Sequence, residues 1–213
     1  LTGGGSTVTI TISSGTGTIG SVTDNGNGTY TATVTSPVLE GSGFFVATMA
    51  GQPVKSGTGS QTEATVAYVP GPFDHFSIAN ISSPQVATIP FNLVITAHDV
   101  NHNTVAGFTG PVGLSVNSGS ITPATSGWFT GGVRTESVDL TTSGTNRTIT
   151  VDDGSGHIKT SNTFTVVKEP TTGVLTTAPN PSTFEQSVTL KDSVSGSVPD
   201  GGKVYFKVDG SVI

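Results

Sequence analysis

The chain contains no cysteine, and few of its residues are charged or aromatic. Without cysteine, no disulfide can cross-link the fold and no thiol chemistry is available. Charged residues make up 10% and aromatic residues 7% of the 213 residues. The eight Lys and Arg residues are scattered and the net charge is −6, which excludes the basic patch that nucleic-acid binding requires. An anionic membrane surface would repel such a chain.

Long hydrophobic runs are also missing. No apolar run reaches the length of about 18 residues that a membrane-spanning helix needs, and the first residues lack the basic-then-apolar pattern of a signal peptide. The chain is rich instead in Thr, Ser and Val, with 29 Gly to supply turns. Apolar and polar residues alternate in 7–12 and 30–34, which is the period of a half-buried strand. The composition and the alternation together predict an all-β fold of many short strands.

The strand and turn pattern divides the chain into three modules, which we number first (1–70), second (71–169) and third (170–213). Two short, semi-rigid joints connect the modules, at residues 69–72, which include Pro70 and Pro72, and at residues 168–170, which end with Pro170. The second module is long enough for a complete β-sandwich, whereas the outer two are expected to be incomplete, as in a piece of a longer array. In the first module, strands are expected over 6–12, 29–35, 43–50 and 62–69.

A tight turn followed by a strand is the clearest motif of the first module. Residues 24–28 read DNGNG, and Asn and Gly tolerate the positive φ that a hairpin turn needs. Together with Thr29 and Tyr30, the turn resembles the D-N-G-x-G-T-Y segment of invasin/intimin-type bacterial immunoglobulin-like domains. That resemblance implies that Tyr30 packs near the turn and opens a core strand.

The second and third modules resemble other bacterial immunoglobulin-like repeats. The second is similar to a repeat of large prokaryotic surface proteins, except that His102 stands where the repeat usually has Gly. The third has the pattern P-N-P-S followed by Q-S-V-T-L, with Glu185 in place of the usual Gly. These resemblances imply tandem immunoglobulin-like Greek-key β-sandwiches. The segments that carry the second resemblance are 73–78, 90–97, 112–116, 121–123, 133–140, 147–151 and 162–166.

One loop of the second module has the spacing of calcium ligands. Asp99, Asn101 and Asn103 follow the D-x-N-x-N pattern, although Thr104 and Gly110 stand where a complete calcium loop has Gly and Glu. Hydrogen-bonded Asx turns explain the same residues. Two interpretations of Asp99, Asn101 and Asn103 are therefore open, a weak calcium site and hydrogen-bonded Asx turns, and no cofactor other than calcium is expected.

All four histidines belong to the second module. His98 and His102 are four residues apart, a spacing that suits zinc on a helix. Here they flank a turn between strands, where this spacing is not expected to bring both rings to one face. We therefore expect two exposed turn residues rather than a metal site.

An aromatic pair and three sequons are the remaining candidate surface sites. Trp128 and Phe129 lie among glycines, and two interpretations are open: they contact a sugar or a protein partner, or they plug one end of the sandwich. Asn27, Asn80 and Asn146 each begin the sequon for N-glycosylation.

No catalytic motif accompanies this architecture. The abundant Ser residues do not occur in a G-x-S-x-G elbow, so no catalytic residues and no enzyme activity are expected.

The sequence predicts a structural or adhesive segment of an extracellular cell-surface protein: a stalk, adhesin, surface-layer or filament component. Two alternatives remain open, namely a spacer or carbohydrate-binding module of a secreted polysaccharide-active enzyme, and a strand-exchanged filament subunit. The expected partners are neighbouring modules of the same chain, like subunits in a fibre or surface layer, and surface glycans. Neither nucleic acid nor membrane insertion is expected.

Overall fold

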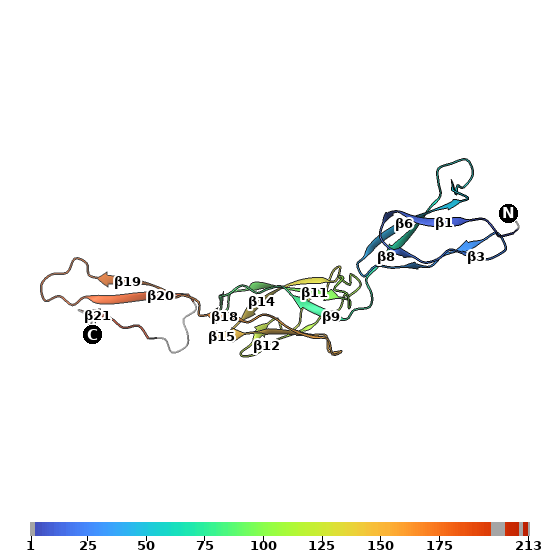
Figure 1. The fold of residues 1–213 in the computed structure, drawn as a ribbon. Coiled ribbons are helices and arrows are strands. Elements are labelled where there is room, and N and C mark those ends of the chain that lie inside the picture. The colour runs from blue at the N-terminus through green and yellow to red at the C-terminus, as the bar shows by residue number, and fades with distance from the viewer. Residues whose placement is uncertain (1–2, 197–202, 209–210, 213) are drawn as a thin grey trace.

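The chain is built from strands and turns over the part that the structure describes, residues 3–196, 203–208 and 211–212. In this computed structural model, the strands pair within three successive groups that span residues 8–68, 75–167 and 172–212. Figure 1 shows the groups one after another along an elongated molecule, with the two termini at opposite ends. None of the described residues belongs to a helix long and apolar enough to cross a membrane. The all-β architecture confirms the predicted fold class.

The first group of strands is organised around its longest member. The strands are β1 (Val8–Gly15), β2 (Thr18–Ile19), β3 (Thr23–Asp24), β4 (Tyr30–Thr31), β5 (Val34–Thr35), β6 (Gly41–Met49), β7 (Gln52–Pro53) and β8 (Glu63–Tyr68). Strand β6 pairs antiparallel with β1, β7 and β8, and two short ladders, β2 with β5 and β3 with β4, complete the group. Phe45 and Tyr68 are its buried hydrophobic residues. Both rings lie against Gly43, where a Cβ atom would fall 2.6 Å from the Tyr68 hydroxyl, so this position requires glycine.

The turn predicted at residues 24–28 is present between β3 and β4. Asp24 Oδ1 accepts a hydrogen bond from the Gly26 amide at 2.9 Å, and Gly26 adopts a positive φ of 74°. Tyr30 opens β4, and its hydroxyl accepts a hydrogen bond from the Ser6 amide at 3.0 Å. The turn therefore lies where the motif predicts, but the single strand expected over 29–35 is divided: β4 has two residues and pairs with β3, whereas β5 pairs with β2.

The second group is a sandwich whose strands are β9 (His75–Ile78), β10 (Gln85–Val86), β11 (Phe91–His98), β12 (Gly113–Val116), β13 (Ile121–Thr122), β14 (Val133–Leu140), β15 (Gly144–Arg147), β16 (Ile149–Asp152), β17 (Ile158–Thr160) and β18 (Phe164–Val167). One sheet has the order β13-β14-β11-β9, and two three-stranded sheets have the orders β12-β16-β17 and β10-β18-β15. Alternate residues of β11, namely Leu93, Ile95 and Ala97, are fully buried. Side chains from all three sheets meet in one hydrophobic core.

The third group consists of two hairpins. Strand β19 (Thr172–Ala178) pairs along its whole length with β20 (Thr189–Ser195), and β21 (Lys207–Val208) pairs with β22 (Ser211–Val212). None of the residues described here is buried, and Phe184 is 95% exposed. The described residues of the third module thus pair as strands without enclosing a core of their own. Residues 1–2, 197–202, 209–210 and 213, which the prediction assigns to the outer modules, lie outside the described residues.

Candidate functional site

The loop after β11, residues 99–103, ties the second group of strands to the first. We call this loop the Asp99 turn. The side-chain Nδ2 of Asn103 donates a hydrogen bond to the backbone carbonyl of Val38, in the first group, at 2.7 Å. The amide of Gly71, in the first joint, donates to Asp99 Oδ2 at 2.8 Å. The Asp99 turn thus holds both the first group and the connecting segment.

The Asp99 carboxylate is buried and fully engaged in this arrangement, with only 2% of the residue exposed. Oδ1 accepts hydrogen bonds from the amides of Asn101 at 2.9 Å and Asn103 at 2.8 Å, and Oδ2 accepts one from Asn103 Nδ2 at 2.9 Å in addition to that from Gly71. The hydrogen bond from the Asn103 side chain, supported by the three backbone amides, outweighs burial and lowers the pKa of Asp99 to about 2. At neutral pH the turn therefore carries a fixed negative charge beside the joint.

The contact between the first and second groups is narrow. A hollow of about 360 Å³ lies between the Asp99 turn and residues 36–39 and 67–71. Val38 and Leu39, at its edge, remain 65% and 63% exposed. Little apolar surface is buried here, so the few hydrogen bonds of the Asp99 turn carry much of the specificity of this joint.

The predicted calcium ligands all lie in the Asp99 turn, in different surroundings. Asp99 and Asn103 are buried, and Asn101 is exposed. Within the described residues, no group of three or more His, Cys, Asp or Glu side chains is arranged to hold a metal ion. The Asx-type hydrogen bonds expected as the alternative are present, and calcium binding by these residues stays a prediction.

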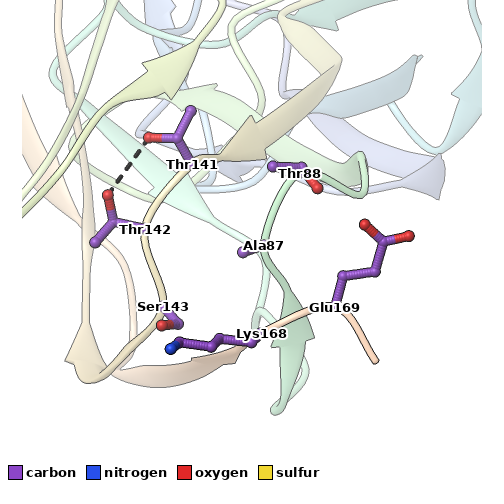
Figure 2. Close-up of a pocket in the computed structure, with 7 residues that line it drawn as sticks. All are labelled: Ala87, Thr88, Thr141, Thr142, Ser143, Lys168 and Glu169. Carbon is purple, nitrogen blue, oxygen red and sulfur yellow. Dashed lines mark hydrogen bonds between the residues drawn. The ribbon is translucent and has the colours of Figure 1, made fainter. Parts of the chain in front are cut away.

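A second hollow, of about 210 Å³, lies where the second group continues into the third (Figure 2). The Thr141 and Thr142 hydroxyls lie 3.5 Å apart on one side of it, and Thr88 adopts a positive φ of 66°. This hollow and the one beside the Asp99 turn thus lie at the joints, outside the interior of the sandwich. The residues that line this second hollow are Ala87, Thr88, Thr141, Thr142, Ser143, Lys168 and Glu169.

The structure separates the two members of the aromatic pair. Phe129 is 3% exposed and packs in the core, with its ring centroid 4.9 Å from that of Phe108 and 6.0 Å from that of Phe76. Trp128 is 69% exposed. Phe129 therefore plugs the sandwich, and Trp128 is the member that a partner could reach. Contact with a partner stays a prediction.

The three sequon asparagines are exposed. Asn27 lies in the turn between β3 and β4, where its Oδ1 accepts hydrogen bonds from the amide and hydroxyl of Thr29. Asn146 lies in β15 with a positive φ of 55°. Asn80 follows β9. Their exposure is what glycosylation requires, and the modification itself stays a prediction.

Three histidines form a cluster that the sequence did not indicate. His75 and His98 are direct cross-strand neighbours of β9 and β11, with ring centroids 5.4 Å apart. His102 adopts a positive φ of 65° and its ring lies 4.8 Å from that of His75 and 6.4 Å from that of His98. The expectation that His98 and His102 stay on different faces is wrong, because the turn folds His102 back over β9. Only the register of the two strands could have revealed this cluster.

Comparisons with known proteins find a family match for the first module. Residues 1–71 match the family model described as invasin, domain 3. None of the curated proteins matches the chain. Among solved structures, the FdeC adhesin of Escherichia coli is 21% identical, covers 76% of this chain and 54% of its own, and gives a TM-score of 0.42. The adhesin InvE of Yersinia pseudotuberculosis is 23% identical, with coverages of 75% and 49% and a TM-score of 0.34.

Invasin, described as a bacterial integrin-binding protein, is 21% identical, with coverages of 81% and 34% and a TM-score of 0.42. The chain thus spans about half, or less, of the length of these structures. Such TM-scores do not define a shared arrangement of whole chains, so the informative comparison is the family match of residues 1–71. The match of residues 1–71 to the model of invasin domain 3 covers a third of the chain, and it confirms the resemblance seen in the turn motif.

Proposed function

We propose that the chain is a non-catalytic structural and adhesive segment of an extracellular, cell-surface protein. Three tandem immunoglobulin-like modules, residues 1–70, 71–169 and 170–213, act in it as a stalk that projects a binding function away from its anchor. The observation that carries this proposal is the hydrogen-bonded Asp99 turn, which fixes an invasin-type module to the sandwich that follows it.

The mechanism of such a stalk is mechanical. The termini lie at opposite ends of the molecule, so each module adds to its length (Figure 1). Antiparallel ladders such as β1 with β6 and β11 with β14 run through the modules, and the second module has a continuous hydrophobic core. Because the contact at the first joint is narrow, the bonds from Asn103 and Gly71 decide how far the two modules can bend. Length and limited bending are the properties that a projecting segment needs.

The partners of the segment follow from its exposed surfaces. Neighbouring modules of the same chain contact one another through the Asp99 turn. Trp128 offers an exposed indole that can stack on a surface glycan or anchor a protein partner. The third module exposes Val174 and Leu175 on the two opposite faces of β19, at 64% and 58%, and a like subunit in a fibre or surface layer could cover either face.

Small-angle X-ray scattering with light scattering on the untagged chain tests the proposal. We expect an elongated monomer whose pair-distance distribution has the long tail of a rod. A compact particle would overturn the stalk. Concentration-dependent polymers would favour the strand-exchanged subunit instead, because that assembly joins identical chains through sheet edges.

The predicted calcium site is tested in the same preparation. If Asp99, Asn101 and Asn103 bind calcium, adding the ion raises the melting temperature of the second module and excess chelator reverses the rise. The variant Asn101→Ala removes an exposed ligand while the bonds of Asn103 remain, so it should abolish the shift. A shift that persists in this variant would place the ion elsewhere.

A further inference from the structure

Two imidazole nitrogens converge on the surface beside the Asp99 turn. Nε2 of His75 lies 3.0 Å from Nδ1 of His102. The side chain of His75 is 32% exposed, and His102 is exposed. An ion in solution can therefore reach the space between the two rings.

The neighbours of the cluster assign its protons. Asp74 Oδ2 lies 2.9 Å from Nδ1 of His75, and since a carboxylate only accepts, His75 carries its proton on Nδ1. In the neutral form of His75, Nε2 then has a free lone pair, which can accept a hydrogen bond from a protonated Nδ1 of His102. A carboxylate that holds one nitrogen of a histidine while the other faces outward is the usual support of a metal-bound imidazole.

The separation of the two nitrogens suits cis ligands of one metal ion. Two nitrogens at about 2.05 Å from a zinc ion lie about 3.3 Å apart in tetrahedral geometry and about 2.9 Å apart at a right angle. The observed 3.0 Å falls between these values. Binding requires the exposed His102 ring to turn and to move its proton from Nδ1 to Nε2, so that both lone pairs face the ion.

His102 is held in place at a conformational cost. Its φ of 65° lies in the left-handed region, which residues other than Gly adopt at a cost in energy. Its backbone carbonyl accepts a hydrogen bond from Nδ1 of His98 at 3.0 Å, and Nε2 of His98 is hydrogen-bonded to the Ser77 hydroxyl at 2.8 Å. His98 therefore positions the turn, and its own nitrogens are not available to an ion.

We propose that His75 and His102 chelate a divalent transition-metal ion of the zinc, nickel or copper class, with Asp74 orienting His75. Imidazole nitrogen suits these ions, whereas calcium prefers oxygen ligands, so this site differs from the calcium site predicted in the Asp99 turn. No third His, Cys, Asp or Glu of the described chain completes the set, so the chelate is bidentate and leaves the other coordination positions to water or to a partner. A bound ion cross-links β9 to the Asp99 turn.

Calorimetric titration of the untagged chain with zinc chloride, near neutral pH in a buffer that does not bind metal, tests the site. We expect one saturable site that His75→Gln and His102→Gly each abolish, and that Asp74→Asn weakens about tenfold or more. Glycine is the residue best suited to the backbone of position 102, so His102→Gly keeps the fold.

The matched control is His157→Gln. His157 is paired with Asp153 at 2.7 Å, outside the cluster, and its loss should leave zinc binding unchanged. A second readout is the rise in melting temperature caused by zinc, which should disappear in His102→Gly and persist in His157→Gln. Saturable binding that survives both His75→Gln and His102→Gly, or no saturable binding by the original chain at millimolar zinc, would overturn the proposal.

Discussion

The substitution Asn103→Ala tests whether the Asp99 turn controls bending at the first joint. It removes the hydrogen bond from Nδ2 to the Val38 carbonyl, a bond between neutral groups that spans the two modules, and also the bond from Nδ2 to Asp99 Oδ2, which lies within the turn and does not cross the joint. A bond like that to Val38 contributes about 1 kcal/mol. Its loss should therefore lower the ratio of docked to undocked joints about fivefold. The hydrogen bond from Gly71 to Asp99 stays in place, so we expect wider bending and not complete release.

Distance measurements between spin labels can detect this change directly. The chain has no native cysteine, so labels can be attached to cysteines introduced at Thr11, on β1, and Ser137, on β14, both of which are exposed. The distance distribution should be narrow in the original chain and broader in Asn103→Ala. Urea denaturation of the same samples shows whether the second module remains folded.

Asn101→Ala is the matched control for this measurement. Asn101 lies in the same turn but is exposed, and it bonds to Asp99 through its backbone amide, which alanine retains. Its distance distribution should equal that of the original chain. If Asn103→Ala also gives an unchanged distribution while remaining folded, the contact with Val38 does not restrain the joint and the reasoning is refuted.

Three further predictions concern pH, the core and the exposed surface. The pKa of Asp99 in the folded chain, about 2, lies below its ordinary value of 3.8. The free energy that the ionised carboxylate contributes to the folded turn is therefore fully present above pH 3.8 and is lost as the pH falls toward 2. The distribution of label distances across the joint should broaden over that pH range. Leu93→Ala should cost the second module about 2–5 kcal/mol of unfolding free energy, whereas Val100→Ala, at a 72% exposed position, should change it by less than about 0.5 kcal/mol in urea denaturation. Phe129→Ala should cost about 3–5 kcal/mol. Trp128→Ala should leave stability nearly unchanged but weaken retention of the chain on immobilised surface glycans; equal retention would remove Trp128 as a glycan contact.

Alternation in the sequence was sufficient to predict the long strands. Residues 43–50 were expected to form a strand, and β6 spans Gly41–Met49. The two-residue strands were harder to predict from the sequence, because two residues are too few to show an alternation of apolar and polar side chains. Strand β10 is the clearest case: Gln85 pairs in parallel with Val166, far along the chain, and nothing within β10 itself indicates that partner.

In the candidate sites, too, contacts between near neighbours in the sequence could be predicted, whereas contacts between distant residues could not. The spacing of Asp99, Asn101 and Asn103 drew attention to the correct turn, because Asx hydrogen bonds form between near neighbours. The bonds that give the turn its role reach Gly71 and Val38, which are 28 and 65 residues from their partners in the turn. Such contacts depend on how whole modules pack, so no local motif records them.

The metal site and the joint share the same turn, and their effects should therefore be coupled. His102 contacts His75 through its ring, and the next residue, Asn103, bonds to Val38 in the first module. An ion that fixes the His102 ring against β9 restricts the backbone of Asn103 as well, so saturating zinc should narrow the label distance distribution across the joint. The variant His102→Gly should show no narrowing, although its bond between Asn103 and Val38 is intact. If zinc binds but the distribution of the original chain does not change, the metal site stabilises only the second module and has no influence on bending.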